Sequence, residues 1–160
     1  MKEMNRTKKI GWIGFLLCAS LWAAPYIDNG NGTVTDSATG LIWQKCSRGQ
    51  GTTLGNCSTG NISFNTWSSA IIYCEGLTLG GRSDWRLPNI NELGSIIDYI
   101  KSSNPIIDST AFPNTRSDGY WSSSTSAQST GSAWYINFSN GYVDYNSKTA
   151  NYFVRCTTGL

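Results

Sequence analysis

The residues that most often carry catalysis are sparse in this chain of 160 residues. It contains no histidine, which excludes Ser-His-Asp and Cys-His catalytic schemes and any zinc site that needs an imidazole ligand. Asp84 and Glu92 are the two carboxylates that a glycoside hydrolase would need as a pair. However, Glu92 stands three positions after Asn89, as in a helix capping box. Asp84 lies between Arg82 and Arg86, and a salt bridge to either explains it, so we expect no catalytic residue and no enzyme.

Oxygen ligands for calcium lie close together in the segment 28–36. Asp28, Asn31 and Asp36 offer carboxylate and amide oxygens, but their spacing does not match an EF-hand loop. The same residues stand in turns rich in glycine and asparagine, where such side chains commonly hydrogen-bond the local backbone. We therefore expect turns that cap their own backbone here, with no metal and no cofactor.

A polar and aromatic surface is predicted near the C-terminus. The segment Ala133–Ser139 alternates an apolar set, Trp134, Ile136 and Phe138, with a polar set, Tyr135, Asn137 and Ser139. A period of two sends the first set to the core and the second to the surface. Asn140-Gly141 predicts a two-residue type I′ turn, after which Val143 faces inward while Tyr142 and Asp144 face outward. Such a mixture of tyrosine, asparagine and serine is typical of antibody binding sites, and it is also common on any solvated sheet.

The first 24 residues have the pattern of a cleavable signal peptide. A charged region holds Lys2, Arg6, Lys8 and Lys9, an apolar run follows over 10–19, and Ala23-Ala24 provide small residues for cleavage. The apolar run is shorter than the roughly 20 residues that a transmembrane helix needs, although a retained anchor is the alternative. We expect a single domain over 25–160 that is secreted, periplasmic or on the cell surface, with membrane contact only through an uncleaved signal.

Removal of this leader changes the net charge. Four of the 12 basic residues and one of the 10 acidic residues lie in 1–24, so eight bases and nine acids remain. This balance gives no bulk electrostatic case for binding nucleic acid, and no nucleic-acid partner is expected.

Four cysteines follow the leader: Cys46, Cys57, Cys74 and Cys156. An even number of cysteines in an exported chain is typical of two disulfides, and four cysteines permit three connectivities. A four-cysteine metal site is disfavoured because no C-x-x-C pair is present.

Two helices and several short strands should position these residues. The first helix begins after Asn65 or Thr66, and the second begins after the capping residue Asn89. Apolar residues at helical spacing are Trp67, Ala70, Ile71, Cys74 and Leu77 in the first helix, and Leu93, Ile96, Ile97 and Ile100 in the second. Strands are predicted at 33–36, 41–43, 120–122, 133–139, 142–146 and 152–156, with loops over 47–61 and 101–119. The fold class is therefore α+β, with two helices packed on short antiparallel strands.

Six motifs carry a resemblance to a known family. They are Asp28-Asn29-Gly30-Asn31-Gly32-Thr33-Val34-Thr35-Asp36, Thr39-Gly40-Leu41-Ile42-Trp43-Gln44, Asp84-Trp85-Arg86-Leu87-Pro88-Asn89, Tyr120-Trp121-Ser122-Ser123, Ala133-Trp134 and Val154-Arg155-Cys156. In this order the motifs resemble the Lcl C-terminal domain family over about 26–158. The resemblance implies a bacterial envelope or secreted protein with a fold similar to C-type lectins and formylglycine-generating enzymes. In the adhesin that names the family the domain is associated with sulfated polysaccharides, whereas the near-neutral charge of this chain argues against that ligand.

The spacing and the resemblance together predict the disulfides. Cys46–Cys57 would close a loop rich in glycine, serine and threonine, and Cys74–Cys156 would tie the first helix to the last strand.

We expect the chain to be a lectin-like or adhesin-like domain that binds a glycan or a protein through C-terminal strands and loops. The expected ligand-binding residues are Arg116, Tyr120, Trp121, Tyr135, Asn137, Ser139, Tyr142, Asp144, Tyr145 and Asn146. Some lectin-fold relatives diversify such a surface with retroelements, and the residue types here fit that pattern. A structural or assembly protein of the envelope is the main alternative, and a carboxylate-dependent hydrolase is a further one. Nothing in the sequence indicates an oligomeric state.

Overall fold

The computed structural model describes residues 25–51 and 57–159, so the predicted signal peptide over 1–24 lies outside the described residues. The strands are β1 (Tyr26–Asp28), β2 (Thr33–Asp36), β3 (Ile42–Gln44), β4 (Gly119–Thr125), β5 (Ser132–Asn137), β6 (Tyr142–Ser147) and β7 (Thr157–Thr158). The helices are α1 (Trp67–Glu75) and α2 (Ile90–Ser95). Within the described ranges, neither helix is long and apolar enough to cross a membrane.

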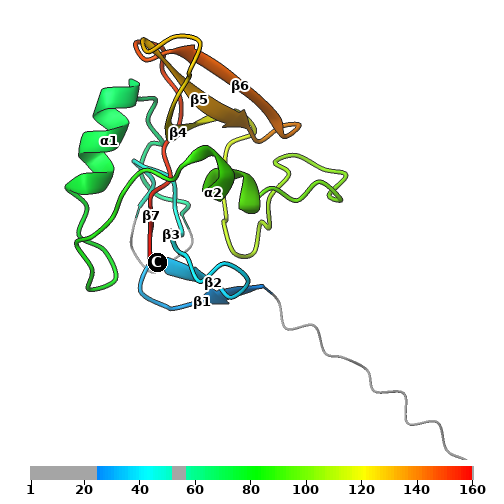
Figure 1. Ribbon diagram of the computed structural model, residues 1–160. Coiled ribbons are helices and arrows are strands. Elements are labelled where there is room, and N and C mark those ends of the chain that lie inside the picture. Colours follow the sequence, from blue (N-terminus) through cyan, green and yellow to red (C-terminus); the bar gives the residue numbers. More distant parts are fainter. Residues whose placement is uncertain (1–24, 52–56, 160) are drawn as a thin grey trace, which may run out of the picture.

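The strands form two separate antiparallel sheets. The first has the order β1-β2-β3-β7 and joins the two ends of the domain, because β7 pairs with β3. The second has the order β4-β5-β6. Figure 1 shows the two sheets at opposite ends of the molecule, with α1 to one side and α2 between them. The predicted α+β class with two helices on short antiparallel strands is confirmed.

Both helices begin where capping residues predict. The Thr66 side chain accepts a hydrogen bond from the Ser69 amide at the start of α1. At the start of α2, Asn89 and Glu92 form the predicted capping box. However, α2 ends at Ser95, one turn earlier than expected, and the prediction that Ile100 packs into the core is wrong, since its exposed fraction is 96%.

The core consists of two clusters. One joins β2 and β3 to Leu93, Ile107 and Phe112, and the other surrounds Trp85 and Trp121 beneath α1. The two predicted disulfides are confirmed. Cys74–Cys156 lies in the second cluster, and Cys46–Cys57 closes the loop that follows β3.

The C-terminal hairpin differs from its prediction in three ways. The turn has four residues, because Asn137 pairs with Tyr142 and the Gly141 amide donates to the Asn137 carbonyl. Trp134 is only partly buried and Val143 is 41% exposed, since α2 packs on β4 and β5 and leaves the edge strand β6 largely uncovered. The segment 152–156 is not a full strand: Tyr152 and Phe153 form isolated bridges, and the regular strand is β7.

Candidate functional site

The disulfide loop after β3 folds back on itself and forms one wall of the site. The Gly51 amide donates to the Thr59 carbonyl, and Gln50 pairs with Gly60 as an antiparallel bridge. Gly60 has a φ of 77°, and a Cβ there would overlap the carbonyl oxygen of Gly49. Only glycine therefore allows the two arms of the loop to approach this closely.

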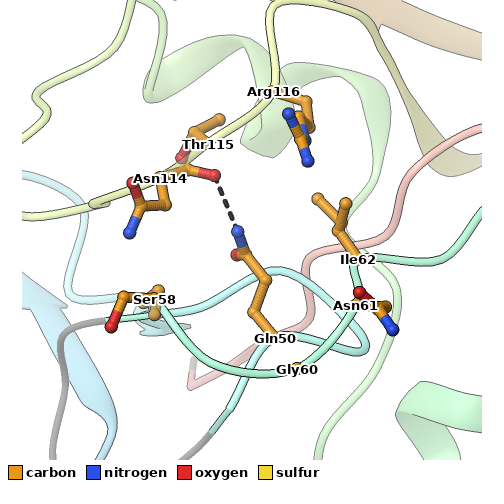
Figure 2. Close-up of a pocket in the computed structure, with 9 residues that line it drawn as sticks. Gln50, Ser58, Gly60, Asn61, Ile62, Asn114, Thr115 and Arg116 are labelled. Carbon is orange, nitrogen blue, oxygen red and sulfur yellow. Dashed lines mark hydrogen bonds between the residues drawn. The ribbon is translucent and has the colours of Figure 1, made fainter.

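A polar pocket of about 400 Å³ opens between this loop and the segment 114–116. Its lining residues are Gln50, Cys57, Ser58, Gly60, Asn61, Ile62, Asn114, Thr115 and Arg116. Figure 2 shows Gln50 reaching across towards the Asn114 carbonyl, with Arg116 on the same side of the pocket as Ile62. The Gln50 amide donates to that carbonyl at 2.7 Å and its oxygen accepts from the Ser47 amide at 2.9 Å, so this side chain fixes the spacing of the two walls.

Arg155 holds the same two walls together from inside the protein. It is fully buried, and its guanidinium donates to Ser47 Oγ at 3.2 Å and to Thr115 Oγ1 at 2.8 Å. It also donates to the carbonyls of Gln44 and Lys45. Burial lowers the pKa of Arg155, because the neutral acceptors around the guanidinium only partly replace its lost hydration.

An aromatic pocket of about 390 Å³ adjoins the polar pocket, and the two share Ile62 and Arg116. Its other lining residues are Phe64, Ser117, Asp118 and Phe153. The Phe64 ring stacks on Phe153 with centroids 4.2 Å apart, yet Phe64 remains 56% exposed. The pocket therefore presents an accessible ring beside polar groups.

The hairpin forms a second, flatter surface. The strand register places Tyr135, Asn137, Tyr142, Asp144 and Asn146 on one face, as predicted. The longer turn shifts the pairing by two residues, which preserves the face of every side chain. Tyr135 stacks on Tyr152 at 4.2 Å, directly over Gly119, where a Cβ would overlap the Tyr152 ring.

Much of this hairpin surface is already engaged. Burial, followed by a hydrogen bond with Tyr152, raises the pKa of Tyr135. Asp144 and Asn146 each accept a hydrogen bond from the amide of the following residue, along the free edge of β6. Asn146 also donates to the Tyr152 hydroxyl at 3.0 Å. These contacts stabilise the hairpin and reduce the number of groups that a ligand meets unpaired.

Four of the predicted ligand-binding residues lie elsewhere than expected. Tyr120 and Trp121 are fully buried, so neither offers surface to a ligand, and this part of the prediction is corrected. The Tyr120 hydroxyl is within hydrogen-bonding distance of Ser47 Oγ, and the Trp121 ring donates to the Asn65 carbonyl. Tyr145 lies on the opposite face of the hairpin against Trp134, and Ser139 lies in the turn. Arg116 lines both pockets.

The carboxylates considered for catalysis or calcium have structural partners. Glu92 forms a bidentate pair with Arg86, at 2.7 Å for both bonds, and also accepts from the Asn89 amide. Asp84 pairs with Arg82. Asp28 pairs with Lys45 and caps the Gly30 amide, so the Asn/Gly-rich segment caps its own backbone as expected. Within the described ranges no group of three potential metal ligands occurs.

Sequence patterns alone did not identify most of the pocket residues. Most of them come from the loops 47–61 and 101–119 or from just beyond these loops, where no periodicity marks a residue. They are Gln50, Asn61, Phe64, Asn114 and Asp118. The only signal was the disulfide that closes the first loop, since a long loop held by covalent and hydrogen bonds is often functional.

Comparison with known proteins identifies the family. No curated protein matches the chain. The family model described as the Lcl C-terminal domain matches residues 32–158, which include the pocket walls and the whole hairpin. The chain therefore belongs to the Lcl C-terminal domain family.

Proposed function

We propose that this chain is a non-enzymatic, lectin-like module outside the cytoplasm that binds a glycan in the two adjoining pockets. The observation that carries the proposal is the Phe64 ring, which is 56% exposed in a pocket wall. Large exposed apolar side chains in concave, partly polar sites commonly mark binding surfaces. The two disulfides agree with an oxidising compartment, which is where such a module would act.

The chemistry of the two pockets suits a sugar. A sugar ring has an apolar C–H face, which packs on an aromatic ring, and hydroxyls around its rim, which need donors and acceptors. Phe64 provides the ring, while Asn61, Ser117 and Asp118 provide side-chain donors and acceptors nearby. The finer assignment of the fold as C-type-lectin-like is part of this proposal, because in such folds irregular loops on a disulfide-stapled frame form the ligand site.

A glycan array on the purified protein tests the proposal. We expect selective binding that Phe64→Ala reduces at least tenfold, because the mutation removes the stacking platform. Ile72→Ala is the matched control: Ile72 is 70% exposed on α1 and lines neither pocket. Loss of binding in the control alone, or binding that is unchanged in Phe64→Ala, would rule out these pockets as the glycan site.

An assembly role in the envelope is the second candidate. Exposed apolar side chains gather on the turn after α2 and on β6: Tyr99, Ile100, Tyr142, Val143 and Tyr145. Such side chains often mark contacts between proteins. A blank glycan array together with concentration-dependent self-association would favour this role.

A further inference from the structure

Arg116 stands apart from the other basic residues of the described chain. Lys45, Arg82 and Arg86 are in ion pairs. Arg48 and Lys148 lie over aromatic rings, Lys101 donates to a backbone carbonyl, and Arg155 is buried. Among residues 25–51 and 57–159, the exposed guanidinium of Arg116 alone has neither an ion pair nor a hydrogen-bond partner.

The surroundings of Arg116 favour an anion on the side of the polar pocket. No described residue that lines this pocket is acidic, and positions 52–56, which complete the disulfide loop, carry no charged residue type in the sequence. Thr115 in the pocket wall accepts a hydrogen bond from Arg155. Arg155 is a buried cation whose described acceptors are all neutral, so no carboxylate cancels its positive charge behind this wall. On the other side of Arg116, Asp118 lines the aromatic pocket and would repel a second anion there.

A single anionic group fits this arrangement better than a polyanion does. A polysulfated chain is held by several cations along its length, whereas seven of the eight bases are already engaged and the acids in 25–160 outnumber the bases by one. One planar guanidinium matches one carboxylate through two parallel hydrogen bonds. The volume of about 400 Å³ admits one sugar ring with its substituents.

We propose that the polar pocket holds an acidic sugar residue of the glycan, with its carboxylate on Arg116 and its ring between Asn61 and Thr115. The proposal rests on the proposed function, since it names the sugar class that the same site takes. Gln50 is a positioning residue, because it sets the distance between the two walls.

Titration of the purified protein with matched sugars tests this proposal. The probes are the methyl glycosides of glucuronic, galacturonic and N-acetylneuraminic acids, each compared with its methyl ester, which keeps the ring and removes the charge. The methyl glycoside of 6-O-sulfogalactose is the sulfated neutral sugar for comparison. We expect at least one acid to bind tenfold or more tightly than its ester and to shift the Nε–H resonance of Arg116 in NMR spectra. Arg116→Gln should abolish the preference for the acid, whereas Arg48→Gln, which removes an equal charge outside both pockets, should leave it unchanged.

Three outcomes would overturn the proposal. The first is equal binding of acids and esters, the second is an acid preference that survives in Arg116→Gln, and the third is tighter binding of a sulfated neutral sugar than of every carboxylated one. If neutral sugars bind and Phe64→Ala reduces that binding, the proposed function stands while the carboxylate inference falls. If no sugar of either kind binds, both fall.

Discussion

At the residue scale, Arg155 shows how one side chain organises distant segments. Its hydrogen bonds join Gln44 and Lys45 at the end of β3, Ser47 in the disulfide loop and Thr115 in the other pocket wall. Its guanidinium also lies over the Phe112 ring, 4.8 Å from the centroid. These contacts must offset the cost of burying a cation that has no anionic partner.

Replacement of Arg155 measures whether its hydrogen bonds outweigh the cost of burying its charge. We expect Arg155→Met, which keeps most of the volume, to lower the free energy of unfolding by about 2–4 kcal/mol, because the buried carbonyls of Gln44 and Lys45 lose their donor. Arg82→Met breaks a solvent-exposed ion pair with Asp84 and should change stability far less than Arg155→Met does. Urea unfolding compares the variants. An Arg155→Met protein as stable as the unchanged one would show that the cost of burying the cation cancels its hydrogen bonds.

Glu92 predicts a dependence of stability on pH. Burial raises the pKa of Glu92, but hydrogen bonds from Arg86 and from the Asn89 amide outweigh it, so the pKa lies below the usual 4.5. A carboxylate with a lowered folded pKa stabilises the protein above its unfolded pKa, and this stabilisation is lost as the pH falls through the folded pKa. The stability difference between the protein and Glu92→Gln should be largest above the usual pKa of 4.5 and should shrink as the pH falls below it, through the lowered folded pKa.

Unfolding curves between pH 3 and pH 7 check this expectation, with Glu75→Gln at the exposed end of α1 as the control. A constant difference between Glu92→Gln and the unchanged protein across that range would mean that the Arg86–Glu92 pair contributes no titrating stability.

At the element scale, α2 depends on both its cap and its packing. Asn89→Ala removes the acceptor for the Asn91 and Glu92 amides and should cost about 1 kcal/mol. Leu93→Ala should cost more, about 2–5 kcal/mol, since Leu93 is fully buried and the change leaves a cavity. The denaturation midpoints of the two variants test this order of stabilities. A larger loss of stability in Asn89→Ala than in Leu93→Ala would contradict this account of the helix.

The hairpin should respond unevenly to mutation. Tyr142→Ala, at a position that is 60% exposed, and Asp144→Ala, at a half-buried position whose carboxylate accepts one local amide hydrogen bond, should each change stability by less than about 1 kcal/mol. Tyr135→Ala should cost more than about 1 kcal/mol, because Tyr135 stacks on Tyr152 and meets the edge of Trp121. Melting temperatures of the three variants test it, and three equal values would show that the tyrosine stack contributes nothing.

At the scale of the whole molecule, the two disulfides constrain loops of very different length. Cys74–Cys156 spans 82 residues and Cys46–Cys57 spans 11. In the chain-entropy model, the disulfide that closes the longer loop raises the free energy of unfolding by about 4.5 kcal/mol, and the disulfide that closes the shorter loop raises it by about 3 kcal/mol. We expect the Cys74→Ser, Cys156→Ser double variant to lose more stability than the Cys46→Ser, Cys57→Ser double variant, as measured by thermal unfolding. The reverse order would show that packing in the pocket loop outweighs chain entropy.

The local features of the fold follow from the sequence by itself. Asn89 and Glu92 specify the start of α2, the alternation around Ile136 specifies the faces of the hairpin, and the paired cysteines specify a stapled domain. Each depends on contacts within a few residues or on covalent chemistry, which a linear pattern records. The faces were predicted even though the turn length was not, because a shift of two residues leaves every side chain on its own face.

Only the tertiary structure decided which of these residues reach the surface and where the pockets lie. Ile100 has the spacing of a core residue and is exposed, because α2 ends before it, while Tyr120 and Trp121 are buried beneath segments far away in the sequence. The walls of the polar pocket lie about 60 residues apart and meet through Gln50 and Arg155. Contacts between such distant segments leave no periodic trace along the chain, since they depend on how whole elements pack and not on the order of neighbouring residues.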